Sequence, residues 1–206
     1  MIIPEGFDLS IAHSYQKIYL EKLYEEIPFE RFDVVVDVGA NIGIFAEYAL
    51  GKKVDKIIGI EPCSDNVFFL KQNCPPVSVF QCGVWDKKDE LEFYSYRQFR
   101  GMSHFDGWDM FIPELPTISK VKVYQLDDLL NEERVDFINM DIEGAELKAL
   151  AGARETICKH KPILMVAVYH RKGDSVDIPN MMLELVPEYR VKFLGSSRCM
   201  NALFYV

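Results

Sequence analysis

Ionisable side chains stand at the ends of several short apolar runs, where they could bind a ligand or move a proton. Asp37 and Glu61 close two such runs in the first third of the chain, and Asp141 and His170 close two more in the last third. Carboxylates attract cations and accept hydrogen bonds from hydroxyls, and histidine can accept a proton near neutral pH. In an open α/β sheet, ligands bind at the edge where parallel strands end. If these runs are parallel strands, the four groups belong to one site.

The first of these runs lies in the stretch 33–50, which predicts a strand, a glycine turn and a helix. The valines between positions 34 and 38 suit a strand that is buried on both faces. Gly39 and Gly43 let the backbone bend and approach a ligand closely. Asn41 is the expected N-cap of the helix that follows. Such turns favour phosphate, nucleoside or sulfonium cofactors.

The charge beside the turn distinguishes these cofactors. A dinucleotide site has the spacing G-x-G-x-x-G and presents backbone N–H groups to a pyrophosphate, whereas this turn has G-x-x-x-G with Asp37 before it. A carboxylate there would repel a pyrophosphate and attract an ammonium group. Glu61, after the next strand, can accept both hydroxyls of a ribose. S-adenosylmethionine carries a ribose, an ammonium and a sulfonium. The alternative is that Asp37 only caps the turn.

A second strand–turn–helix unit follows directly. Strand 56–60 leads into a helix from Ser64, and strand 77–81 comes next, so the right-handed crossover rule makes these strands parallel. The corner formed by Cys82 and Gly83 would then lie near the adenine of the ligand, or it is a plain turn.

An insertion is expected after this unit. Residues 84–96 predict a hairpin, and 97–119 predict a long loop. The loop is rich in aromatic side chains, which could hold a sugar or another ring-bearing acceptor or could plug the edge of the domain. They include Phe99, His104, Phe105, Trp108 and Phe111.

The second informative stretch is 135–153. Its apolar strand delivers Asp141 and Glu143 to the start of a helix that carries Glu146. Acidic residues at a helix start also complement the helix dipole. We therefore expect capping from Glu146 and a functional role for Asp141.

The remaining elements frame this edge of the sheet. His170 follows another buried strand, so we expect it on the same edge as Asp141. The segments 189–194 and 201–206 predict an antiparallel hairpin. At the other end, 10–27 predicts an amphipathic helix in which His13 is a surface or packing residue.

Composition limits the class of protein. A chain of 206 residues with 49% apolar residues fits a single domain over 1–206, with a helical extension at about 8–28 and an insertion at about 84–120. The excess of 32 acidic over 23 basic residues argues against nucleic acid as a partner. We expect a cytoplasmic protein without a membrane span, since no signal peptide or long apolar run is present. The five scattered cysteines have no zinc spacing. The oligomeric state is left open.

Four motifs together resemble one known family. They are VDVGANIG at 36–43, GIEP at 59–62, INMDIEGAELKALAGA at 138–153 and KPILMVAVYHRKGD at 161–174. With them the chain resembles FkbM-family methyltransferases, within the class I S-adenosylmethionine-dependent fold. The resemblance implies a Rossmann-like three-layer α/β sandwich with a mostly parallel sheet and an antiparallel C-terminal strand. It also implies that Pro62 of the GIEP motif belongs to the cofactor site, and that a hydroxyl of a sugar, glycan or natural product is O-methylated.

For the chemistry we hypothesise that His170 takes the proton of the acceptor hydroxyl and that Asp141 orients it or binds the acceptor. A metal-assisted alternative, which we do not favour, uses Asp141 and Glu143 as ligands of Mg²⁺. Two other functions are considered. A nicotinamide-dependent oxidoreductase is disfavoured because the third glycine of the dinucleotide fingerprint is missing. A non-catalytic module could keep the fold and bind cofactor only.

Overall fold

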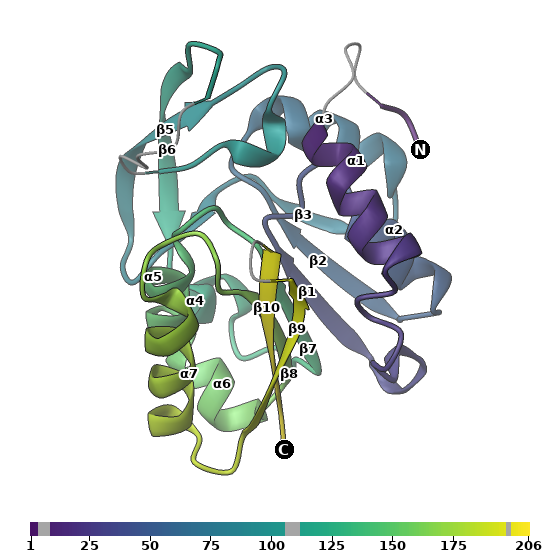
Figure 1. The fold of residues 1–206 in the computed structure, drawn as a ribbon, viewed down its shortest axis with the longest axis vertical. Helices are drawn as coiled ribbons and strands as arrows, with labels where there is room; N and C mark the ends of the chain where they lie inside the picture. Colours follow the sequence, from purple (N-terminus) through teal and green to yellow (C-terminus); the bar gives the residue numbers. More distant parts are fainter. Residues whose placement is uncertain (4–8, 106–111, 197–198) are drawn as a thin grey trace.

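A mostly parallel sheet forms the centre of the molecule. The computed structural model describes residues 1–3, 9–105, 112–196 and 199–206. Within these ranges, seven strands form the sheet in the spatial order β3-β2-β1-β7-β8-β10-β9 (Figure 1). They are β1 (Val34–Val38), β2 (Lys56–Ile60), β3 (Ser78–Phe80), β7 (Phe137–Met140), β8 (Ile163–Ala167), β9 (Arg190–Ser196) and β10 (Cys199–Tyr205). Neighbours from β3 to β8 are parallel, and β10 is antiparallel to β8 and β9. The predicted fold class is confirmed.

Helices cover both faces of this sheet (Figure 1). One face carries α1 (Leu9–Tyr15), the π-helix η1 (Gln16–Leu20), α2 (Ile44–Gly51) and α3 (Ser64–Asn73), and the other carries α4 (Leu126–Leu130), α5 (Glu146–Ala151), α6 (Arg154–His160) and α7 (Asp174–Leu185). Side chains alternate along β1, so Val34, Val36 and Val38 enter the core under α4 to α7. Val35 enters the core under α1 to α3. This explains the unbroken run of valines.

The N-terminal helical segment is shorter than predicted. We expected one helix over 10–27, but the α-helix ends at Tyr15 and a π-helical turn continues it to Leu20. Lys22 then adopts a φ of 55°, which right-handed helices do not contain. The helix therefore ends well before Pro28. A 3₁₀ turn, η2 (Phe29–Arg31), leads into β1.

The insertion forms a small second sheet rather than the predicted hairpin. Its strands are β4 (Gly83–Val84), β5 (Asp89–Ser95) and β6 (Thr117–Tyr124), in the spatial order β4-β6-β5. Both β4 and β5 pair with β6, and they do not pair with each other, so the hairpin expected over 84–96 is wrong. Two lysines of β6 face two glutamates of β5, which favours this pairing. Such pairing over a long sequence separation is not visible in a local pattern.

The segment predicted as a loop over 97–119 contains the 3₁₀ turn η3 (Arg100–Met102) and the first residues of β6. Of the aromatic residues singled out there, Trp108 and Phe111 lie outside the described residues. The turn η3 lies beside α1, so the two segments border the same edge of the sheet. Among the residues that the structure describes, no helix is long and apolar enough to cross a bilayer.

Candidate cofactor and acceptor site

The glycine turn after β1 brings the ends of β1 and β7 into contact. Gly39 has a φ of 88°, and a Cβ atom there would lie 2.2 Å from the carbonyl oxygen of Asp141. Glycine is therefore required at this position. Gly43, with a φ of 97°, is the N-cap of α2, so the predicted N-cap role of Asn41 is wrong. Asn41 instead lines the cavities described below, and its buried Oδ1 has no hydrogen-bond partner among the described residues.

Asp37 is a buried carboxylate with one satisfied oxygen. The side chain of Asn139 donates a hydrogen bond of 2.9 Å to Oδ1, and Tyr24 donates one of 2.7 Å to Asn139 in turn. Within the described part of the chain, Oδ2 has no partner. Burial raises the pKa of Asp37 to about 7, although the bond from Asn139 opposes this. Asp37 lines the larger cavity, so its unpaired oxygen can meet a cationic group of a ligand.

Glu61 holds the turn in place and still faces the ligand cavity. Its carboxylate accepts hydrogen bonds of 2.9 Å from the backbone N–H groups of Asn41 and Cys63, and one of 3.3 Å from the side chain of Asn66. Burial raises the pKa of Glu61. A carboxylate has about four acceptor positions, so three of them are used by the protein. Acceptor capacity therefore remains on Glu61 for a ligand hydroxyl, and the expected contact with both ribose hydroxyls stays a prediction.

A smaller cavity lies beside Glu61. Its lining includes Pro62, Cys82 and Gly83, so the structure brings the predicted nucleoside-binding residues together. The ring of Phe105 packs against Gly83 in the wall of this cavity. A Cβ atom at Gly83 would lie only 2.3 Å from the Phe105 ring. The corner after β3 is thus shaped by a close aromatic contact, and its proposed place beside the adenine stays a prediction.

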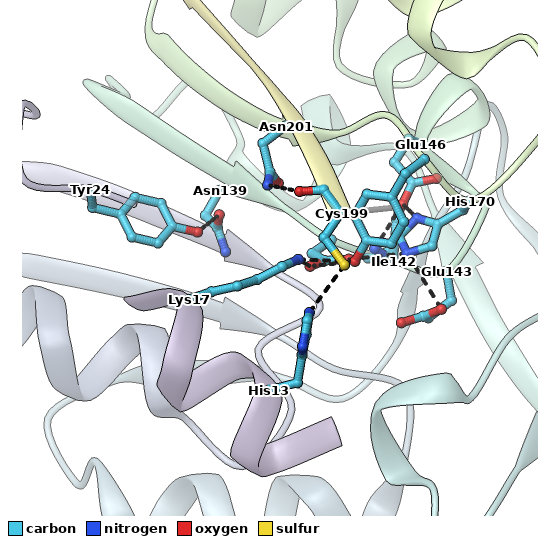
Figure 2. A network of polar contacts seen from close by, with 12 residues as sticks. His13, Lys17, Tyr24, Asn139, Ile142, Glu143, Glu146, His170, Cys199 and Asn201 are labelled. Carbon is cyan, nitrogen blue, oxygen red and sulfur yellow. Dashed lines mark hydrogen bonds and ion pairs between the residues drawn. The ribbon is translucent and has the colours of Figure 1, made fainter. Parts of the chain in front are cut away.

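His170 sits behind the loop that follows β7. Its Nδ1 lies 2.8 Å from Oε1 of Glu146, and its Nε2 lies 3.4 Å from carboxylate oxygens of both Asp141 and Glu143 (Figure 2). Oε1 of Glu146 also accepts the backbone N–H of Ile142 at 3.0 Å. Glu146 is an acidic residue in the first turn of α5, but the N-cap is Ala145 and Ile142 precedes the helix, so this bond fixes the loop and does not cap the helix. Glu146 also orients His170, which the sequence did not indicate.

The surroundings of His170 argue against its predicted role as a base. Burial lowers its pKa, but the carboxylates of Glu143, Glu146 and Asp141 outweigh burial and raise the pKa to about 10. The imidazole is then already protonated at neutral pH. Its side chain is only 1% exposed, and it is not part of the lining of either cavity bordered by described residues. Burial also raises the pKa of Glu143, to about 8.

Lys17 and Tyr169 are site residues that sequence reasoning missed. Lys17 Nζ lies 3.2 Å from the Tyr169 hydroxyl, 4.7 Å from the centre of its ring and 3.9 Å from Oδ2 of Asp141. His13, treated as a surface or packing residue, has Nε2 3.3 Å from Sγ of Cys199 and lines the larger cavity (Figure 2). The four-residue spacing of His13 and Lys17 was visible in the sequence. The direction in which the Lys17 side chain points depends on the π-helical turn η1, which the sequence did not indicate.

The two cavities meet at the ends of β1 and β7. The larger one has a volume of about 420 Å³ and includes Asp37, Lys17 and Tyr169 in its lining. Gly39, Asn41, Gly101, Asp141 and Glu143 line both cavities. A ligand in the smaller cavity and one in the larger cavity would therefore approach each other at Asp141.

This sheet order and the paired cavities at the strand ends define a class I methyltransferase. The sequence pattern described as the Methyltransferase FkbM domain matches residues 37–193. The chain therefore belongs to the FkbM methyltransferase family, as the motifs indicated.

Individual relatives agree with this assignment. The chain is 26% identical over 190 residues to "Methyltransferase 1" of Beauveria bassiana (strain ARSEF 2860), with 81% of this chain and 76% of that protein covered. It is 27% identical to "Methyltransferase sdnD" of Sordaria araneosa, with 68% of each covered. Among solved structures, Methyltransferase FkbM from Methylobacillus flagellatus KT is similar, with a TM-score of 0.65 at 26% identity. That match covers 84% of this chain but 44% of the other, so this chain spans less than half of that protein.

The cluster of Asp141, Glu143 and His170 has the residue types of a metal site. One ligand atom from each lies within 4.8 Å of the others. Pairing between protonated His170 and the two carboxylates accounts for this arrangement, so the cluster does not by itself support Mg²⁺. Turnover that survives exhaustive EDTA treatment would exclude the metal-assisted alternative, and turnover that Mg²⁺ restores would establish it.

Proposed function

We propose that this protein is an S-adenosylmethionine-dependent O-methyltransferase whose acceptor is a hydroxyl of a small molecule or glycan, such as a sugar or natural product. The observation that carries the proposal is the meeting of two cavities at Asp141, with buried carboxylates on the wall of each. When bound, S-adenosylmethionine would supply an electrophilic methyl group at this junction.

The residues of the turn fit the cofactor in chemical type. Oδ2 of Asp37 lacks a partner within the described residues and would accept a hydrogen bond from an ammonium group. Glu61 has acceptor capacity left for a ribose hydroxyl. Cys82 and Gly83 border the same cavity as Glu61 and would face the base.

Asp141 is better placed than His170 to act on the acceptor. It lines both cavities, and its side chain is 37% exposed, whereas that of His170 is 1% exposed. We assign to Asp141 the acceptance of the proton of the acceptor hydroxyl. The bound cofactor would supply the methyl group by cleavage of its sulfur–methyl bond, with S-adenosylhomocysteine as the leaving group. His170 then acts as a positioning residue, because its Nε2 contacts the carboxyl groups of both Asp141 and Glu143.

The variant Asp141→Asn tests this assignment. Loss of a positioned base typically lowers the rate by about 10²- to 10⁴-fold, and we expect a decrease of that order in transfer from labelled S-adenosylmethionine to acceptors in a small-molecule extract. Affinity for S-adenosylhomocysteine, measured by calorimetry, should change little. Full turnover in this variant would exclude Asp141 as the base.

The competing functions give different binding results. Calorimetry with S-adenosylhomocysteine and with NADH should show binding of the first alone. Binding of NADH alone would favour the oxidoreductase. Binding of S-adenosylhomocysteine without transfer to any acceptor would favour the non-catalytic module.

A further inference from the structure

Lys17 is a buried ammonium group whose hydrogen-bonding capacity is mostly unused. The residue is 7% exposed. Among the described residues, the Tyr169 hydroxyl is its one hydrogen-bond partner, at 3.2 Å. An ammonium has three N–H donors, and the 3.9 Å separation from Asp141 is an ion pair without a hydrogen bond. Buried charges are normally paired and hydrogen-bonded, so this group is suited to a further partner.

That partner would come from the larger cavity. Lys17 lines this cavity, and the neutral donors or acceptors of Ser14, Asn201 and His13 border it as well. Figure 2 shows Lys17 and His13 extending from the N-terminal helical segment toward Cys199 and the cluster around His170. Lys17 is absent from the lining of the smaller cavity, where the nucleoside would lie. Asp37, which would bind the ammonium group of the cofactor, also lines the larger cavity. Lys17 Nζ lies 3.9 Å from Asp141, the group assigned to the acceptor hydroxyl, so we place Lys17 on the acceptor side of the site.

The charges around Lys17 restrict what it can bind. An ammonium attracts an oxyanion. Asp37, Asp141 and Glu143 line the same cavity, so a group with two negative charges, such as a phosphate monoester, would meet repulsion from several directions. A carboxylate carries one negative charge and matches one ammonium. Since Lys17 Nζ lies 3.9 Å from Asp141, the carboxylate and the reacting hydroxyl must be close neighbours in the acceptor.

We propose that the acceptor is a hydroxy acid whose carboxylate binds Lys17 while its hydroxyl faces Asp141. This inference rests on the proposed methyl transfer and narrows the class of acceptor. Lys17 would then determine specificity, because it would reject the corresponding neutral alcohol.

Fragment binding tests the inference without knowledge of the whole acceptor. The protein is first titrated with S-adenosylhomocysteine, and failure at this step would overturn the proposed function itself. The saturated complex is then titrated separately with glycerate, glycerol and glycerol 3-phosphate. Binding is measured by calorimetry or by NMR chemical-shift changes. Since a hydrogen bond to a charged group contributes about 1.5–3 kcal/mol, glycerate should bind about 10- to 100-fold more tightly than glycerol.

Two lysine variants show whether Lys17 is responsible. Lys17→Met should abolish the preference for glycerate over glycerol, and Lys17→Arg should retain part of it. Lys52 is a matched control, since its Nζ lies 5.1 Å from the centre of the Tyr48 ring on an exposed surface outside both cavities. Lys52→Met should keep the full preference. Equal binding of glycerate and glycerol, tighter binding of glycerol 3-phosphate, or an unchanged preference in Lys17→Met would overturn the inference.

Discussion

The buried carboxylate of Asp37 destabilises the folded ligand-free protein, and the same property would favour binding of a cationic ligand. Its carboxylate is buried, and one oxygen has no partner among the described residues. Removing a charged group from water without full compensation destabilises the folded state. A ligand that brings an ammonium group to this oxygen relieves the penalty, so the unmet interaction favours binding of a cation.

Glu146 is expected to influence Asp141, the proposed base, through His170, which lies between them. Replacing it by glutamine in Glu146→Gln keeps an acceptor for the backbone N–H of Ile142 but removes the negative charge 2.8 Å from His170. The pKa of His170, which its carboxylate neighbours raise to about 10, should fall. The imidazolium of His170 then loses its proton at a lower pH, so the pH above which turnover declines should move downward, on the order of one unit.

The pH profile of turnover measures this effect. Glu155→Gln, on an exposed position of α6, serves as the control and should leave the profile unchanged. An unchanged profile in Glu146→Gln would show that His170 has no electrostatic influence on the reaction.

At the scale of elements, the contact between the ends of β1 and β7 decides whether the site can form. Gly39→Ala places a Cβ atom 2.2 Å from the carbonyl oxygen of Asp141 and requires an alanine at a φ of 88°. The backbone strain alone is about 1–3 kcal/mol. We expect lower stability in urea unfolding and loss of measurable binding of S-adenosylhomocysteine.

A second glycine provides the control for this substitution. Gly51→Ala, at the end of α2, meets no atom within 4 Å, and alanine favours helix. It should be neutral or slightly stabilising. Wild-type cofactor affinity in Gly39→Ala would contradict the requirement for close approach of the two strands.

The strand–turn–helix units were predictable because each is local. The valine run, the glycine turn and the motif 141–146 each carry their own pattern, and strands joined by a helix can pair in few ways. The β4-β6-β5 sheet and the end of the N-terminal helix at Leu20 were not predictable. The first depends on pairing across the insertion, and the second on a π turn and on Lys22 in a left-handed conformation.

The candidate site residues divide in the same way into those predictable from a local pattern and those that depend on packing. Asp37, Glu61 and Asp141 stand at strand ends and could be found from the sequence. Lys17 reaches Tyr169 and Asp141 across more than 100 positions, so only the packed structure brings it into the site. Similarly, the sequence placed His170 at the right edge but could not show that three carboxylates surround it.

For the whole molecule, the buried carboxyl groups predict how stability depends on pH. Burial raises the pKa of Asp37 to about 7 and that of Glu143 to about 8. When the folded pKa of an acid is raised, the folded state is favoured while the acid is protonated. This contribution is lost as the pH rises from about 4, the ordinary value, through about 7 to 8. The ligand-free protein should lose stability over that range.

Asp37→Asn removes one of these groups while keeping an acceptor for the bond from Asn139. At pH 8 the ligand-free variant should melt at a higher temperature than the wild type, by a shift on the order of 5 °C. The difference should shrink at pH 5. Asp55→Asn, on an exposed position, should show neither effect. A variant that melts below the wild type at pH 8 would contradict the unfavourable burial of Asp37.

The central claim is that Asp37 binds the cationic amino-acid part of an adenosyl cofactor. S-adenosylhomocysteine and 5′-methylthioadenosine share the thioether nucleoside, but only the first carries the ammonium group. Calorimetry of the wild type should show about 10- to 100-fold tighter binding of S-adenosylhomocysteine, and Asp37→Asn should bind the two almost equally. The same preference in wild type and variant, or no binding of either compound to the wild type, would contradict the claim.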